Sequence, residues 1–302
     1  MQNNDYLVTF SSIIIDDVLL WTGEISLGHL GGSAHTAAGC VVWWDKVAIA
    51  TPVGVDDYGW ITEKLASVNI DTSGITTLNK NTLRSWDIYH PDETRIQIPR
   101  MAYEYEMDSL PDFETLPELF SKAAGYHVYT RKAKELLTQI KQINPHAAVV
   151  LEPSGLEKDV DAQNYYSEVL PMVDVFSPNL KEGETITGEK EPREMINTLL
   201  RWGAHWVIIR MGDKGSLSGT SDGTLLEVPA APAKVVDVTG AGNSYMGGLV
   251  CGMVQARTIE ACLAMAAVSA SFTIEQYGIA RPNNEERDRR FQVVLEGIVT
   301  KN

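Results

Sequence analysis

Short apolar runs alternate with segments of helical period along most of this 302-residue chain, and this alternation constrains the fold more than any other feature. The runs are too short for core helices and show no polar alternation, as expected of strands that are buried on both faces. Six runs are predicted to be strands, at residues 6–10, 46–51, 126–130, 147–152, 173–177 and 206–210. Strands that alternate with helices predict an α/β fold, with a mostly parallel sheet covered by helices on both sides.

One part of the chain departs from this alternation. Polar and apolar residues alternate over residues 82–101, which is typical of a β-hairpin, and residues 13–25 are also strand-like. A few strands inserted into an α/β chain form a small separate sheet, which can serve as a lid. We therefore predict one domain over residues 1–302, with lid strands within about 11–25 and 82–103.

Composition excludes several classes of partner. The chain has 25 basic and 40 acidic residues, a formal net charge of −15, and no basic stripe, so we expect no nucleic-acid partner. No apolar stretch approaches 18 residues, and the first ten residues lack the basic start and apolar run of a signal peptide. We expect a cytoplasmic protein with no membrane partner.

The segment Asp237-Val-Thr-Gly-Ala-Gly-Asn243 has the pattern of an anion-binding turn. Gly240, Ala241 and Gly242 let the backbone turn its N–H groups inward, and a helix expected to begin near Asn243 adds the positive end of its dipole. Such a turn suits the charge that develops during phosphoryl transfer. Glycines also serve merely to pack a helix against a strand, and the sequence leaves both readings open.

Two further loops carry glycines or paired polar residues. Gly31 and Gly32 precede a helix of small residues, where a ligand can approach the backbone or helices can simply pack tightly. Asn179 and Glu182 lie one helical turn apart after a predicted strand. They could order water around Mg²⁺, or they could cap the helix that follows.

A fourth loop follows the predicted strand that ends at Arg210. Gly212 and Gly215 mark a turn there, which fits either a nucleotide shelf or a plain hairpin. All four loops follow predicted strands or precede helices. Ligands in open α/β sheets bind at the carboxyl ends of the strands, so we expect these loops to converge on one site.

Together these motifs resemble the ribokinase-type (PfkB) carbohydrate kinases over nearly the whole chain. The resemblance rests on the two glycines at 31–32, the block at 53–75, Asn179-Leu-Lys-Glu182, the turn at 211–215 and the glycine loop at 237–248. It implies a Rossmann-like three-layer α/β/α sandwich with a β-sheet lid. The implied activity is ATP-dependent phosphorylation of a small hydroxylated substrate, a sugar or a nucleoside, with Mg²⁺ as a cofactor.

The resemblance also implies roles for individual residues. The substrate-binding residues are Asp16, Gly31, Gly32 and Thr36; the nucleotide-binding residues are Asn179, Glu182, Arg210, Gly212 and Gly215; the anion hole is Gly240, Ala241 and Gly242. Glu182 would act on Mg²⁺ indirectly. Asp237, with residues near Gly278, would hold a monovalent cation such as K⁺.

Two residues depart from the family pattern. Thr36 stands where the family has an asparagine that contacts sugar hydroxyls, which leaves the substrate open. Asn243 stands at the position of the aspartate that accepts the substrate's proton, and an amide cannot do so. Three accounts stay open: a slow kinase that uses water or another carboxylate, a ligand-binding or regulatory relative without catalysis, and an asparagine introduced to trap a substrate complex.

The predicted lid also suggests an oligomer. Residues such as Trp86, Ile88 and Ile96 place apolar side chains on the lid strands. They fit a homodimer in which lids pair between protomers, and they fit equally a lid that covers only its own site.

Overall fold

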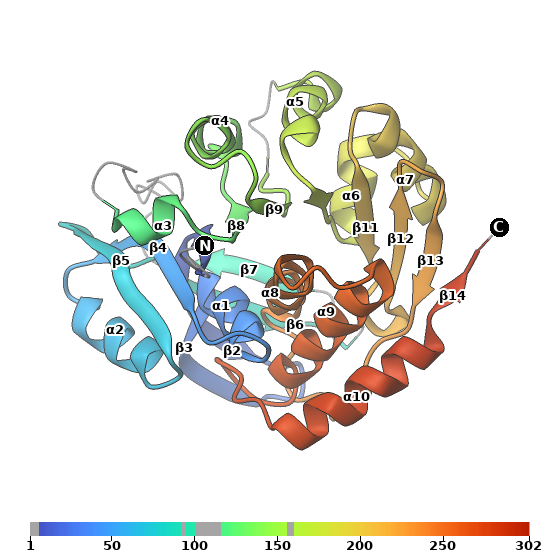
Figure 1. The fold of residues 1–302 in the computed structure, drawn as a ribbon. Helices are drawn as coiled ribbons and strands as arrows, with labels where there is room; N and C mark the ends of the chain where they lie inside the picture. Colours follow the sequence, from blue (N-terminus) through green and yellow to red (C-terminus); the bar gives the residue numbers. More distant parts are fainter. Residues whose placement is uncertain (1–5, 92–94, 101–115, 156–159, 302) are drawn as a thin grey trace.

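The computed structural model describes residues 6–91, 95–100, 116–155 and 160–301, and these residues form two sheets and their covering helices (Figure 1). The strands of the larger sheet are β1 (Leu7–Ser11), β4 (Val47–Gly54), β5 (Ile70–Leu78), β8 (Gly125–Tyr129), β9 (Ala148–Leu151), β10 (Val175–Phe176), β11 (Trp206–Arg210), β12 (Ser216–Thr220), β13 (Leu225–Val228) and β14 (Val299–Thr300). Their order in space is β14-β13-β12-β11-β10-β9-β8-β1-β4-β5.

The larger sheet is mixed. Strands from β5 to β11 pair in parallel, and β12, β13 and β14 continue the sheet antiparallel beyond β11. The expected strands all occur, and the mostly parallel sheet is confirmed for seven of its ten strands. The antiparallel edge arises because only a short turn separates β11 from β12, too short for the crossover that a parallel neighbour needs.

Helices cover both faces of this sheet, as a three-layer sandwich requires (Figure 1). One face carries α1 (Ser33–Val41), α2 (Tyr58–Ala66), α8 (Ala241–Val254), α9 (Ile259–Thr273) and α10 (Asn284–Gly297). The other face carries α3 (Glu118–Ser121), α4 (Ala133–Ile143), α5 (Ala162–Val169), α6 (Leu180–Thr187) and α7 (Pro192–Arg201). Each layer has its own hydrophobic cluster against the sheet, which confirms the predicted α/β/α architecture.

Helix α8 is packed unusually closely between α1 and α9 because it carries glycines at the contacts. A Cβ placed on Gly247 would lie 2.2 Å from the carbonyl oxygen of Thr36, and one on Gly248 would lie 2.5 Å from that of Met265. Such distances exclude any side chain. The close packing fixes the N-terminus of α8, and with it the glycine loop, against the body of the protein.

The smaller sheet contains β2 (Ile13–Leu19), β3 (Ile25–Gly32), β6 (Arg84–Tyr89) and β7 (Arg95–Pro99), in the order β3-β2-β6-β7. Strands β6 and β7 pair antiparallel, as the hairpin pattern predicts, whereas β2 and β6 pair in parallel. The predicted lid range of 82–103 includes residues 92–94 and 101–103, which lie outside the described residues.

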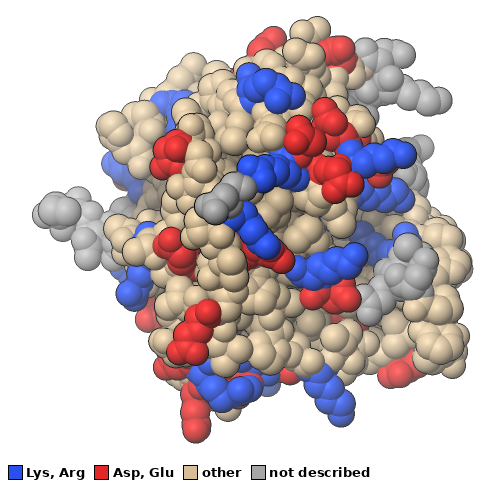
Figure 2. Space-filling model, turned by 90° about the vertical axis from the view of Figure 1, so that its right-hand side faces the viewer, with Lys and Arg blue, Asp and Glu red and all other residues tan. Residues whose placement is uncertain are grey.

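The surface agrees with the composition. Figure 2 shows basic and acidic side chains interspersed on one face of the molecule, without a continuous basic band. Within the described ranges, no helix is long and apolar enough to cross a membrane.

Candidate active site

The glycine loop at the start of α8 has the geometry of an anion-binding turn. Gly240 holds the N-cap position with a φ of 77°, and the helix begins at Ala241. The N–H groups of Gly242 and Asn243 donate to no acceptor among the described residues. Free N–H groups at the positive end of a 14-residue helix favour a bound anion.

The expectation that this helix begins near Asn243 is wrong. The left-handed conformation of Gly240, which other residues rarely adopt, turns the chain into the helix earlier, and Asn243 lies within the first turn. Its side chain does not cap the helix. The Nδ2 of Asn243 instead donates to Glu152 Oε1 at 2.9 Å, so Asn243 is held by a residue that directly follows β9.

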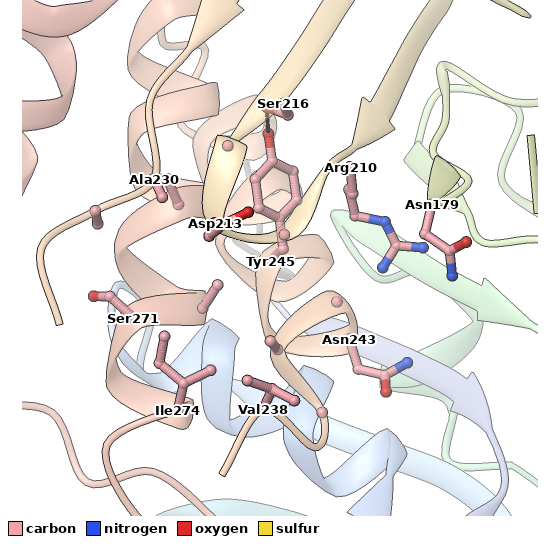
Figure 3. Close-up of a pocket in the computed structure, with 18 of the residues that line it drawn as sticks. Asn179, Arg210, Asp213, Ser216, Ala230, Val238, Asn243, Tyr245, Ser271 and Ile274 are labelled. Carbon is pink, nitrogen blue, oxygen red and sulfur yellow. Dashed lines mark hydrogen bonds between the residues drawn. The ribbon is translucent and has the colours of Figure 1, made fainter. Parts of the chain in front are cut away.

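A cavity of about 600 Å³ opens beside the loop (Figure 3). It is lined by every residue predicted for the anion hole and the nucleotide, namely Asn179, Glu182, Arg210, Gly212, Gly215, Gly240, Ala241, Gly242 and Asn243. Figure 3 shows the side chains of Arg210 and Asn243 at one end of this cavity, on neighbouring elements. Three of the four expected loops therefore converge, and the volume is typical of a small-molecule site.

Glu152, which sequence reasoning missed, is the centre of the polar contacts in this cavity. Its Oε1 accepts hydrogen bonds from Asn243 Nδ2 and from His127 Nε2, both at 2.9 Å. Its Oε2 accepts from Arg210 Nη1 at 2.8 Å. Burial raises the pKa of Glu152, but Arg210, His127 and Asn243 outweigh burial and lower the pKa to about 2. The carboxylate is therefore ionised at neutral pH.

Arg210 lies directly against the glycine loop. A Cβ placed on Gly242 would lie 2.0 Å from Arg210 Nη1, so the guanidinium occupies the space over this glycine. Its Nη2 donates to the carbonyl oxygen of Ser177 at 2.9 Å, while its buried Nε donates to no acceptor among the described residues. A guanidinium next to free N–H groups makes this corner of the cavity suited to a phosphate group.

The residues predicted to bind substrate do not line that cavity: Asp16, Gly31 and Gly32 lie in strands of the smaller sheet, and Thr36 lies in α1. Asp16 on β2 is 3% exposed, and its Oδ1 accepts from Ser85 Oγ at 2.7 Å. A Cβ on Gly31 would lie 1.8 Å from Asp16 Oδ2, so only glycine fits there. Gly32 has a φ of 59° at the N-cap of α1, and Thr36 is fully buried in α1, with no partner for its hydroxyl among the described residues.

Comparison with known proteins decides the family. The pfkB family of carbohydrate kinases matches this chain over residues 10–287. The chain belongs to the pfkB family of carbohydrate kinases. It is therefore a kinase, a phosphotransferase of the sugar and nucleoside class, as the sequence resemblance indicates.

Individual relatives agree with this assignment. A cytidine kinase from Thermococcus kodakarensis is 27% identical over 277 residues, covering 90% of this chain and 97% of that protein. A ribokinase from Cryptococcus neoformans in complex with ADP superposes with a TM-score of 0.76 at 19% identity, covering 95% of this chain and 99% of the other. A putative ribokinase II from E. coli in complex with ATP and Mg²⁺ superposes with a TM-score of 0.74 at 17% identity. The match covers 96% of this chain and 99% of the other. These structures confirm the ribokinase-like fold.

Asn179 and Glu182 of this PfkB-family kinase form a capping box at the start of α6. Asn179 Oδ1 accepts from the Glu182 N–H at 2.9 Å, and Glu182 Oε2 accepts from the Asn179 N–H at 2.7 Å. Glu182 Oε2 also lies 3.5 Å from Arg210 Nη2. The helix-capping interpretation therefore describes real contacts, while both residues still line the cavity.

The turn that contains Gly212 and Gly215 joins β11 to β12 as a hairpin. Both glycines have positive φ, 63° and 77°. A Cβ on Gly215 would lie 2.0 Å from the carbonyl oxygen of Val228, whereas one on Gly212 would meet nothing within 4 Å. Gly215 is thus required by packing, and Gly212 leaves open space at the cavity wall.

Asp237 is buried beside the glycine loop. Its Oδ1 accepts from the N–H of Thr239 at 2.9 Å and from the hydroxyl of Thr239 at 2.7 Å. Its Oδ2 accepts no hydrogen bond from the described residues. Burial raises the pKa of Asp237, and Thr239 and His29 counteract this effect. One carboxylate oxygen therefore stays available to a ligand.

The part of the chain that the structure describes contains no group of three or more His, Cys, Asp or Glu side chains that could hold a metal ion by itself. Mg²⁺ in kinases is usually bound by one or two carboxylates together with the phosphates of the nucleotide. Glu182 at the cavity wall fits that limited role, which needs the nucleotide to complete the site.

Proposed function

We propose that this protein transfers the γ-phosphoryl group of ATP to a hydroxyl group of a small sugar or nucleoside. One observation supports this most: free N–H groups at the start of α8 lie beside the Arg210 guanidinium in a cavity of about 600 Å³. Phosphoryl transfer depends mainly on positioning the reactants and on stabilising negative charge. The free N–H groups and the guanidinium can do both for a bound phosphate.

The proposed roles follow the placement of the residues. The nucleotide would lie along Asn179, Arg210, Gly212 and Gly215, with its terminal phosphate at Gly240, Ala241 and Gly242. Glu182 would act on Mg²⁺ through water, and Asp237 would hold a monovalent cation such as K⁺. The substrate would lie beneath the smaller sheet, acting as a lid, in contact with Asp16, Gly31, Gly32 and Thr36.

Asn243 favours a second candidate function. A positioned general base contributes about 10²–10⁴ in rate, and a transfer that relied on residue 243 alone would lose that contribution. A relative that binds the same ligands and regulates without turnover would keep the pocket and tolerate the amide.

The homodimer is also a proposal: the small sheet exposes Trp86, Ile96 and Ile98 by 42%, 49% and 39%.

The test combines binding with turnover. ATP with Mg²⁺ at about 100 times its Kd should stabilise the protein by about 2.7 kcal/mol, and ADP should form when ribose or cytidine is added. A thermal-shift assay and a coupled ADP assay measure the two effects. ATP stabilisation without ADP from any acceptor would support the binding protein, and the absence of both would refute both functions.

Gly242→Ala provides a sharper version of the binding test. A Cβ there would displace Arg210 from the glycine loop, so we expect the ATP-induced shift to disappear. Overpacking should also cost about 1–3 kcal/mol of stability. Gly59→Ala is the matched control, because its Cβ meets nothing within 4 Å, and it should bind ATP normally. Equal ATP shifts in the two variants would contradict the anion-hole assignment.

A further inference from the structure

The orientation of the Asn243 amide is fixed by its neighbour. An ionised carboxylate only accepts hydrogen bonds, so the group that faces Glu152 Oε1 must be the NH₂ of Asn243. Oδ1 of Asn243 is consequently the free end of the amide, and it accepts no hydrogen bond from the described residues. A free acceptor on the cavity wall can take a hydrogen bond from a substrate hydroxyl, although it cannot remove the proton.

The negative charge of this corner belongs to Glu152. Its Oε1 takes two donors, Asn243 and His127, whereas Oε2 takes one, from Arg210. Oε2 also lies 3.8 Å from the place where a Cβ on Gly242 would be. A carboxylate oxygen with remaining acceptor capacity thus borders the glycine loop that we assign to the terminal phosphate.

Asn243 and Glu152 therefore act as one unit that carries a single charge. An aspartate at 243 would place a second carboxylate in hydrogen-bond contact with Glu152, and two carboxylates at that distance cannot both ionise. The amide at 243 is the residue type that the neighbouring carboxylate requires. The pair thus holds one carboxylate, on Glu152, which directly follows β9.

We propose that Glu152 is the catalytic carboxylate that receives the substrate's proton, and that Asn243 positions the substrate hydroxyl through Oδ1. This inference rests on the proposed kinase function. The hydroxyl oxygen forms a bond to the γ-phosphorus, the bond from that phosphorus to the β,γ-bridging oxygen breaks, and ADP leaves with the bonding electron pair. The hydroxyl proton passes to Glu152 Oε2 and is then released to water.

Arg210 links the carboxylate to the nucleotide. It donates to Glu152 Oε2 and lies over Gly242, so an incoming phosphate would compete for the same guanidinium. Drawing Arg210 toward the phosphate weakens its hold on Glu152. Because Arg210 is the main group that lowers the pKa of Glu152, this shift makes the carboxylate a stronger base when the nucleotide is bound.

The test is a double-mutant cycle with ATP, Mg²⁺ and either ribose or cytidine as acceptor. Glu152→Gln should lower kcat by about 10²–10⁴, with little change in KM for ATP. Asn243→Asp alone should give no gain over the wild type. Adding Asn243→Asp to Glu152→Gln should restore at least about tenfold of the lost kcat, because it returns one carboxylate to the pair.

Thermal shifts with ATP show whether each variant is folded and binds nucleotide. Should Glu152→Gln unfold, the double variant still decides, because it retains one carboxylate and must exceed Glu152→Gln paired with Asn243→Ala, which has none. Unchanged kcat in Glu152→Gln, or a double variant no faster than Glu152→Gln, overturns the assignment and leaves the kinase proposal intact. No ADP from the wild type with any acceptor overturns both.

Discussion

Asp16 makes the stability of this kinase depend on pH in an unusual direction. Burial, and then the neighbouring Asp87, raise the pKa of Asp16 from 3.8 to about 7, against the lowering effects of Ser85 and Arg95. Between pH 4 and pH 7 the folded protein therefore holds a proton that the unfolded chain releases. The contribution of Asp16 to the free energy of unfolding therefore falls as pH rises through this window, and it is lost above pH 7.

Asp16→Asn removes this pH-dependent loss of stability because an amide stays neutral at every pH. We expect the variant to gain stability relative to the wild type between pH 4 and pH 7, by about a few kcal/mol, and to lose affinity for substrate. Urea unfolding at a series of pH values measures the effect. Asp45→Asn, at an exposed aspartate, is the control. Parallel stability curves for Asp16→Asn and the wild type would show that Asp16 is ionised in the folded state.

Single residues also show where sequence reasoning succeeds and where it stops. Gly31, Gly240 and Gly242 were predicted because a close approach of the backbone calls for glycine, which is visible in the sequence. Glu152 leaves no such mark: it follows the apolar run of β9, and its partner Arg210 lies 58 residues further along the chain. Only the folded sheet brings the ends of β9 and β11 together, so no spacing could reveal this pair.

At the scale of elements, the first turn of α6 serves two purposes. Asn179 and Glu182 cap the helix by reciprocal hydrogen bonds, and they also line the cavity. The sequence left capping and magnesium handling as alternatives. The structure shows that the capping contacts exist, and they hold Glu182 at the cavity wall where its second role would operate.

Glu182→Gln separates the two roles. Glutamine can replace glutamate in a capping box, so we expect stability to stay within about 0.5 kcal/mol of the wild type. Losing the charge should raise the Mg²⁺ concentration for half-maximal activity several-fold. Asn179→Ala, which removes the cap, should cost about 1 kcal/mol. An unchanged Mg²⁺ requirement in Glu182→Gln would leave Glu182 with the capping role alone.

Elements differ in how well the sequence predicts their pairing. The strands of the parallel region were predicted from their continuous apolar character. The antiparallel edge was not, because the turn at 211–215 fits a nucleotide shelf and a hairpin equally well until the neighbouring strands are known. The start of α8 was misplaced for a related reason: a positive φ at Gly240 belongs to the folded loop and cannot be read from a glycine in a sequence.

At the scale of the whole molecule, a strand of the small sheet is hydrogen-bonded to the glycine loop. Tyr89 on the small sheet hydrogen-bonds Thr239 Oγ1 at 2.7 Å. Thr239 donates its own hydroxyl proton to Asp237, so Tyr89 must be the donor. This contact connects the sheet that carries Asp16 to the loop assigned to phosphate, which are the two halves of the proposed reaction.

Tyr89→Phe should weaken this connection while leaving the substrate residues and the phosphate loop in place. Losing one buried hydrogen bond costs about 0.5–1.5 kcal/mol, so we expect kcat/KM for the acceptor to fall about 2–10-fold while ATP binding is kept. Tyr6→Phe is the matched control, since it removes a tyrosine hydrogen bond to Asp71, at the start of the edge strand β5 and outside the cavity lining. If both variants lose stability equally and neither changes kcat/KM, the Tyr89 contact holds the fold together but does not couple the smaller sheet to transfer.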